Sequence, residues 1–206
     1  MIVHIKLALC RHTETDYNAQ GIYTGHRDIP LNEVGRQQAK RLARMLDMYS
    51  FHTILSSDLQ RAREVAKIIE KGRRGTWHKT LAETDPRLRE VNIGDMDGLA
   101  KDIARVRFPE EQYNTRSPNY DFRPIGGESR DQVIERQIQV LSERTGQYGS
   151  DDPDLVPLLV VVGHGTSLRT LVEHLGHQPD LRQGYYQIVP FSAEAAERRG
   201  LLRHWK

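Results

Sequence analysis

The sequence predicts an α/β fold, a three-layer α/β/α sandwich in which helices cover both faces of a mostly parallel central sheet. Short apolar segments alternate with segments whose apolar residues recur at helical spacing, which is the pattern of consecutive strand–helix units. The apolar run at 155–162 is almost unbroken, as expected for a central parallel strand that is buried on both faces. The chain has 206 residues, and we expect a single domain over 1–206.

The N-terminal segment supplies the first strand and the first long helix. The apolar run at 4–10 predicts a strand, and the glycines and proline within 11–30 predict a loop over its end. Asn32 is the expected N-cap of a helix over 33–48. The apolar stripe expected to bury this helix consists of Val34, Leu42, Met45, Leu46 and Tyr49.

A second strand–helix unit follows. The short apolar segment 53–56 predicts a strand, and Ser57 or Asp58 would cap the next helix, which runs to about Glu70. The expected buried face of that helix consists of Leu59, Ala62, Val65, Ala66 and Ile69. The basic run at 71–79 predicts a solvated loop.

The middle of the chain is mostly irregular. Leu81 lies in an expected short edge strand, and Gly94 and Gly98 mark an irregular loop after it. A short helix is expected at 99–107. Prolines and glycines then dominate the following residues, so we expect the segment 100–127 as a whole to form a lid over a site.

The C-terminal part returns to the strand–helix alternation. The segment 128–145 predicts a helix, and the strand at 155–162 follows it. A tight turn at 163–166 leads into a further helix. A last strand is expected at 185–191, and 192–206 forms a charged, alanine-rich tail with helical character.

Composition narrows the compartment and the partners. The chain has 30 basic and 28 acidic residues, and its net charge of +2 does not indicate nucleic-acid binding. No segment approaches the roughly 20 apolar residues of a membrane span, and Lys6 interrupts the N-terminal apolar run, which is therefore not a signal peptide. The single cysteine, Cys10, allows no internal disulfide. We expect a cytoplasmic protein without nucleic-acid or membrane partners.

Three junctions between a strand and a helix carry the polar residues that matter most. Arg11 and His12 follow the first strand, Arg61 lies in the first turn of a helix, and His164 stands between two glycines before another helix. Because parallel strands end at the same edge of a sheet, we expect these residues to converge. Helix N-termini and arginine forks both bind phosphate oxygens. The sequence therefore predicts a phosphate pocket around His12.

The motifs in these junctions resemble those of a known family. Arg-His-Thr-Glu-Thr-Asp-Tyr-Asn at 11–18 and Tyr-Thr-Gly-His-Arg-Asp-Ile-Pro-Leu at 23–31 match the opening of the histidine phosphatase superfamily, in its phosphoglycerate-mutase-like branch. Ser-Ser-Asp-Leu-Gln-Arg-Ala at 56–62 and Gly-His-Gly at 163–165 follow in the family order, and the resemblance runs from residue 6 to about 191. It implies a phosphoglycerate-mutase-like fold.

The resemblance also implies residue roles. His12 would be transiently phosphorylated, and Glu90 matches the proton donor of the family. The remaining residues implied to bind the phosphoryl group or the substrate are Arg11, Asn18, Thr24, Gly25, Arg61, His164 and Gly165, the last through its backbone N–H. Two departures from the family pattern are Thr13, where a glycine is usual, and Gly94-Asp-Met-Asp97-Gly98, where Gly-x-Trp-Glu-Gly is usual.

We therefore expect a metal-independent phosphomonoester hydrolase, a histidine phosphatase, that acts on a small phosphorylated metabolite and needs no cofactor. A neutral His12 would attack phosphorus, with its other ring nitrogen held by a backbone carbonyl. Arg11, Arg61 and a cationic His164 would hold the phosphoryl oxygens. Glu90 would protonate the leaving alkoxide and then deprotonate the attacking water.

The leaving group is not defined by these motifs. The expected lid carries Arg105, Arg107, Arg116 and Arg123, which could bind a second acidic group of the substrate or could be solvated. The tail after residue 191 could pack on a partner, so a homodimer remains an alternative to a monomer.

Other functions remain to be weighed against this one. A cofactor-dependent phosphoglycerate mutase would use the same pocket, but the segment between Glu90 and His164 is shorter than such mutases usually carry. A non-catalytic phospholigand-binding protein would retain the pocket without turnover. A metal site at His174 and His177 lacks a clear third ligand. A cysteine phosphatase is excluded by the absence of an arginine six residues after Cys10, and a P-loop ATPase by the absence of its motif.

Overall fold

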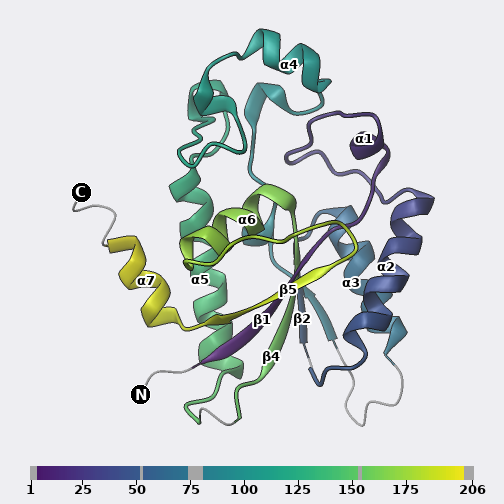
Figure 1. The fold of residues 1–206 in the computed structure, drawn as a ribbon, viewed down its shortest axis with the longest axis vertical. Coiled ribbons are helices and arrows are strands. Elements are labelled where there is room, and N and C mark those ends of the chain that lie inside the picture. The colour runs from purple at the N-terminus through teal and green to yellow at the C-terminus, as the bar shows by residue number, and fades with distance from the viewer. Residues whose placement is uncertain (1–3, 52, 74–80, 153–154, 202–206) are drawn as a thin grey trace.

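A computed structural model describes residues 4–51, 53–73, 81–152 and 155–201 and contains one five-stranded sheet in the order β3-β2-β4-β1-β5 (Figure 1). The strands are β1 (Ile5–Arg11), β2 (Thr53–Ser56), β3 (Leu81–Thr84), β4 (Leu158–Gly163) and β5 (Tyr186–Phe191). The first four run parallel, and β5 pairs with β1 in the antiparallel direction at one edge. The mostly parallel sheet is confirmed.

The pairing of β1 with β4 brings two of the three expected junctions together. Their register runs from Lys6 opposite Leu158 to Arg11 opposite Gly163. The amide of His12 continues this pattern by donating to the Gly163 carbonyl at 2.8 Å. The residues that follow both strands, including His12 and His164, therefore lie at the same edge of the sheet.

Helices cover both faces of the sheet, as expected (Figure 1). Leu7 and Leu9 of β1 face a cluster formed with α5 (Arg130–Tyr148), α6 (Gly165–His174) and α7 (Ala193–Leu201). Ala8 and Cys10 face the opposite cluster, formed with α2 (Glu33–Leu46) and α3 (Gln60–Gly72). This alternation follows from the two-residue period of a strand. Both faces of β1 are apolar because both are covered.

The buried face of α2 shares Leu42 and Leu46 with the expected stripe, and small residues, Gly35, Ala39 and Ala43, complete it. Asn32 is the N-cap, as predicted, and its side chain accepts from the amide of Gly35 at 2.8 Å. Val34 is 53% exposed, whereas Gly35 is buried against the backbone of Glu14. The backbone of Glu14 lies so close to this position that only glycine, which has no side chain, fits there.

A side chain from a distant part of the chain accepts a hydrogen bond from the first turn of α3. The buried face is as predicted, but the N-cap is Leu59, not Ser57 or Asp58. Asp28 accepts from the amide of Gln60 in the first turn, while Asp58 forms an ion pair with Arg89 at 2.6 Å. A tertiary contact therefore supplies the negative charge that favours a helix N-terminus.

A third cluster of apolar side chains lies above the carboxyl ends of the strands, where Figure 1 shows α4 and the surrounding loops. The helix expected at 99–107 is α4 (Lys101–Arg107). The irregular segments around it contain 3-10 turns, η1 (Pro86–Leu88), η2 (Gly94–Met96), η3 (Glu111–Tyr113) and η4 (Arg123–Ile125). The loop expected at 11–30 contains one short helix, α1 (Asp16–Ala19), that a capping box at Thr15 and Asn18 begins.

The remaining differences lie at segment ends. Leu155 is 70% exposed, and β4 begins only at Leu158. Most of the basic run at 71–79 and the end of the tail, 202–206, lie outside the described residues. In the described part of the tail, α7 packs on α6. The Ala196 carbonyl hydrogen-bonds to Nε2 of His174, which disfavours that nitrogen as a ligand of the metal site considered at His174 and His177. The described helices include none that is both long and apolar enough to span a membrane.

Candidate active site

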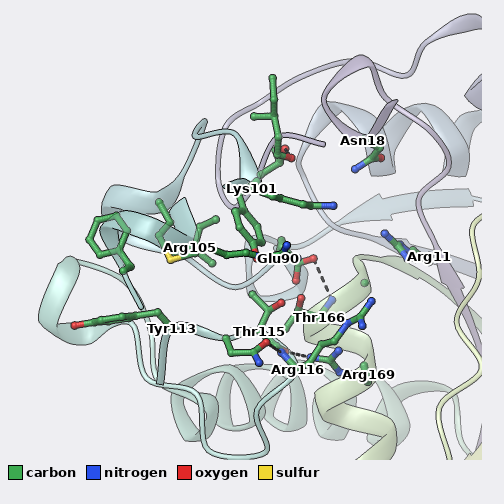
Figure 2. Close-up of a pocket in the computed structure, with 18 of the residues that line it drawn as sticks. Arg11, Asn18, Glu90, Lys101, Arg105, Tyr113, Thr115, Arg116, Thr166 and Arg169 are labelled. Atoms are coloured by element: carbon green, nitrogen blue, oxygen red, sulfur yellow. Dashed lines mark hydrogen bonds between the residues drawn. The ribbon is translucent and has the colours of Figure 1, made fainter. Parts of the chain in front are cut away.

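A cavity of about 730 Å³ lies at the carboxyl ends of the strands, beneath the expected lid (Figure 2). Its floor is formed by the ends of β1 and the starts of α3 and α6, and its far wall by residues within 93–116. Of the nine residues predicted at the site, seven line it: Arg11, His12, Asn18, Thr24, Arg61, Glu90 and Gly165. The predicted residues therefore cluster at the end of the cavity nearest the sheet, while most of the wall is formed by residues that were not predicted.

His12 is held in one orientation by its own neighbour in the chain. Its Nδ1 lies 2.8 Å from the carbonyl oxygen of Thr13. Because a carbonyl can only accept, the proton is assigned to Nδ1, which leaves the lone pair on Nε2. Burial and the nearby charges of Arg61 and Arg11 lower the pKa of His12 well below its usual range. The imidazole is therefore neutral at neutral pH, the form that a nucleophile requires.

His164 lies beside His12, with the two ring centroids 5.2 Å apart, but it is completely buried and does not line the cavity. Burial, with the charge of Arg61, lowers the pKa of His164 well below its usual range, so the ring is neutral in the free protein. The cationic form expected for phosphoryl binding would need the charge of a bound substrate and stays a prediction. Neither of its ring nitrogens has a hydrogen-bond partner among the described residues.

Arg61 is a buried cation whose orientation is fixed by a loop. It is 1% exposed, and its two terminal nitrogens donate to the carbonyls of Gly25 and Arg27, both at 2.8 Å. Burial lowers its pKa to about 10, which leaves the guanidinium charged at neutral pH. Its Nε has no partner within the described chain. The side chain therefore brings a positive charge to the cavity wall and keeps N–H donors beyond the two that the loop carbonyls use.

Arg11 lies directly against the N-terminus of α6. A Cβ atom added to Gly165 would come within 3.0 Å of Cζ and Nε of Arg11, so a larger residue here would push the guanidinium from its position. Burial lowers the pKa of Arg11, while the charge of Glu90 acts in the opposite direction. The two arginines and the positive end of the α6 dipole together make this end of the cavity electropositive.

Glu90 is anchored at the same helix start. Its Oε1 accepts from the amides of Ser167 at 2.8 Å and Val91 at 3.0 Å. Its Oε2 accepts from the amide of Thr166 at 3.1 Å, the contact drawn beside Glu90 in Figure 2. Three backbone donors therefore fix a carboxyl group on the cavity wall, opposite Arg11 in this view.

Two of the residues predicted to contact the substrate lie on the cavity wall, and one does not. Asn18 and Thr24 line the cavity, and the side-chain oxygen of Asn18 also accepts from Nε2 of Gln183 at 2.8 Å. Gly25 does not line it: this residue packs against the backbone of Val91 and presents its carbonyl to Arg61. Gly25 thus orients an arginine and does not form part of the cavity surface.

The lid arginines divide into two pairs. Arg105 and Arg116 line the cavity. Arg107 instead lies over the ring of Phe108, at 5.3 Å from its centroid, and Arg123 pairs with Asp121 at 2.7 Å. The latter two do not belong to the cavity wall.

Two further cations on the wall, Lys101 and Arg169, were not predicted (Figure 2). Arg169 also donates to the carbonyl of Thr115 and so connects α6 to the lid. Helical spacing could have identified Arg169, because it follows Gly165 by four residues on α6 and shares its face. Lys101 lies near the ring of Tyr23, 5.9 Å from its centroid, a contact between segments far apart in the sequence.

Comparison with known proteins places this geometry in a family. The chain is 36% identical over 173 residues to phosphoglycerate mutase-like protein 4 of Arabidopsis thaliana, covering 82% of this chain and 70% of the relative. It is 32% identical over 174 residues to a 2,3-bisphosphoglycerate-dependent phosphoglycerate mutase of Azorhizobium caulinodans, covering 81% and 79%.

A similar solved structure is the mycobacterial glucosyl-3-phosphoglycerate phosphatase in complex with VO3. It shows 29% identity and a TM-score of 0.69, with 88% of this chain and 83% of that one covered. Bacillus stearothermophilus YhfR has 25% identity and a TM-score of 0.71, covering 90% and 95%. The phosphoglycerate-mutase-like fold is thereby confirmed. Residues 7–195 match the sequence profile of the histidine phosphatase superfamily (branch 1), and the chain belongs to that superfamily.

Proposed function

We propose that this protein is a phosphomonoester hydrolase that acts through a phosphohistidine at His12. The observation that carries the proposal is the hydrogen bond from Nδ1 of His12 to the Thr13 carbonyl, beside two guanidinium groups. It leaves a neutral nitrogen with a free lone pair at the electropositive end of the cavity. Phosphoryl transfer depends mostly on positioning and on charge stabilisation, and this arrangement supplies both.

In the first step, Nε2 of His12 attacks phosphorus as the bond from phosphorus to the leaving oxygen breaks. Arg11 and Arg61 hold the nonbridging oxygens, whose charge spreads in the transition state. A protonated Glu90 gives its proton to the leaving oxygen, and the alcohol departs. The negative charge of the substrate also favours a proton on the neighbouring ring of His164, which is neutral in the free protein.

In the second step, water attacks the phosphohistidine and Glu90 takes up its proton. The bond between nitrogen and phosphorus breaks, which regenerates neutral His12 and releases inorganic phosphate. The same carboxyl group therefore serves as acid and then as base, and its three backbone hydrogen bonds keep it in one place through both steps.

The substrate is proposed to carry a second acidic group in its leaving part. Four cations, Lys101, Arg105, Arg116 and Arg169, line the cavity away from the sheet. One phosphoryl group bound by Arg11 and Arg61 does not account for them. A cavity of about 730 Å³ also exceeds what a phosphoryl group alone requires. A small metabolite with a phosphoryl group and a second anion would match both features.

A mutase is the second candidate, because sequence relatives carry that name. Incubation with 3-phosphoglycerate, with and without a 2,3-bisphosphoglycerate primer, separates the two reactions. We expect release of inorganic phosphate from a panel of phosphomonoesters, including p-nitrophenyl phosphate, without need of a primer. Primer-dependent formation of 2-phosphoglycerate without phosphate release would establish the mutase instead. Absence of any turnover from pH 5 to 8 would favour a protein that only binds phospholigands.

A further inference from the structure

Arg136 of α5 lies behind the cavity wall and holds the backbone that carries Glu90. Its Nη1 donates to the carbonyl of Arg87 at 2.6 Å and to that of Arg89 at 2.9 Å. Its Nη2 donates to the carbonyl of Glu90 itself at 3.0 Å. One guanidinium thus gathers three carbonyls from four consecutive residues, although Arg136 does not line the cavity.

Glu128 holds both Arg136 and the backbone that follows Glu90. Nε and Nη2 of Arg136 donate to the two carboxylate oxygens of Glu128 at 2.8 and 3.0 Å. The same carboxylate accepts from the amide of Asn92 at 2.8 Å, just beyond Glu90. The pair is mostly buried, with side chains 16% and 20% exposed. The side chains of Arg136 and Glu128 therefore bind the backbone both before and after Glu90.

The loop that orients Arg61 also contacts the carbonyl oxygen of Glu90. Nε2 of His26 lies 2.9 Å from the carbonyl of Glu90, which therefore has two partners. The residues on either side of His26, Gly25 and Arg27, are the two whose carbonyls hold Arg61. The backbone of Glu90 is thereby fixed relative to an arginine of the phosphoryl-binding end.

We infer that Arg136, held by Glu128, is a positioning residue for Glu90. The segment around Glu90 is irregular and has no ladder of strand or helix hydrogen bonds to fix it. A general acid must nevertheless reach the leaving oxygen within hydrogen-bond distance, and small displacements reduce its effect. Arg136 supplies the fixed backbone from outside the cavity. This inference rests on the proposed function, in which Glu90 protonates the leaving group.

The test compares two leaving groups. p-Nitrophenolate departs without a proton, whereas an alkoxide needs one, so kcat/KM for glycerol 2-phosphate should depend on Glu90 far more than kcat/KM for p-nitrophenyl phosphate. Glu90→Gln sets the reference pattern. We expect Arg136→Met to lower kcat/KM for glycerol 2-phosphate about 10- to 100-fold and that for p-nitrophenyl phosphate by less than about threefold. Arg136→Lys, which retains a donor, should show the same selectivity with a smaller loss.

Arg144 provides the matched control, because it lies on the same helix and pairs with Glu83 at 3.0 Å, away from the cavity. Arg144→Met should leave both rates unchanged. Equal losses on the two substrates in the Arg136 variants, or no loss on either, would overturn the inference. If Arg136→Met does not fold by circular dichroism, Arg136→Lys decides by the same criterion. A wild-type protein that hydrolyses neither substrate would contradict the proposed function itself.

Discussion

Nδ1 of His12 lies 2.8 Å from the carbonyl oxygen of Thr13, so the residue next to the nucleophile selects its tautomer. The contact uses the backbone of Thr13 and leaves its hydroxyl free to donate to the Gly35 carbonyl at 2.8 Å. Positive φ angles occur only at glycines within the described residues, so Thr13 is unstrained where related proteins usually carry glycine. This departure from the family pattern therefore leaves the nucleophile in place.

The buried histidines predict how stability depends on pH. Burial lowers the pKa values of His12 and His164 well below 6.5, so both are neutral in the folded protein. As the pH falls below about 6.5, the unfolded chain binds protons that the folded chain does not, and each such histidine removes up to about 1.4 kcal/mol per pH unit. The urea midpoint should fall from pH 6.5 to 5. A midpoint that rises over this interval would contradict the prediction.

Arg61 is predicted to serve both stability and catalysis. Arg61→Met leaves the carbonyls of Gly25 and Arg27 unpaired and should lower the free energy of unfolding by about 2–4 kcal/mol. It should also lower kcat/KM at least about 100-fold, because a charge that stabilises the transition state is lost. Arg63→Met is the control: this exposed neighbour contacts Asp28 only at 4.0 Å. Similar losses in both variants would argue against a special role for Arg61.

Gly165 is predicted to matter for activity and not for stability. In Gly165→Ala the new Cβ meets the guanidinium of Arg11 at 3.0 Å and displaces it from the start of α6. We expect kcat/KM to fall about 10-fold or more, with the free energy of unfolding changed by less than about 1 kcal/mol. Gly146→Ala, on α5 with nothing within 4 Å, should retain full activity. Full activity of Gly165→Ala would show that Arg11 need not occupy this position.

The lid cations predict a selective effect on substrate binding. Arg116→Ala should raise KM about 10-fold for a phosphomonoester with a second acidic group and leave KM for p-nitrophenyl phosphate nearly unchanged. Arg107→Ala is the matched control, since Arg107 lies over Phe108 and not on the cavity wall. A panel of phosphomonoesters with and without a carboxylate measures the difference. Equal KM changes for the two classes in Arg116→Ala would indicate that the lid does not recognise the second anion.

The sequence predicted what depends on local pattern. The strands, the helices and the positions of His12 and Arg61 follow from apolar periodicity and from polar residues placed where a strand ends or a helix begins. The parallel order of β1, β2 and β4 then brings these ends together. The carbonyl that holds His12 belongs to the next residue, but nothing in residue types shows which way a ring turns.

Contacts between distant segments were beyond such reasoning. Asp28 caps α3 at Gln60, and Arg136 binds the carbonyl of Glu90, 46 positions earlier. His164 is neutral in the free protein because it is completely buried beside His12, a property that its place in the sequence does not reveal. These properties depend on how tightly the assembled elements pack, which periodicity does not specify.

The most direct test of the account is to trap the phosphorylated enzyme. Rapid mixing with a phosphomonoester substrate and quenching in alkali should yield one acid-labile phosphate per chain, which peptide mapping places on His12. The variant His12→Ala should fold, carry no such phosphate and lose several orders of magnitude in kcat. A fully active His12→Ala protein, or a trapped phosphate on another residue, would contradict the central claim that His12 is the nucleophile.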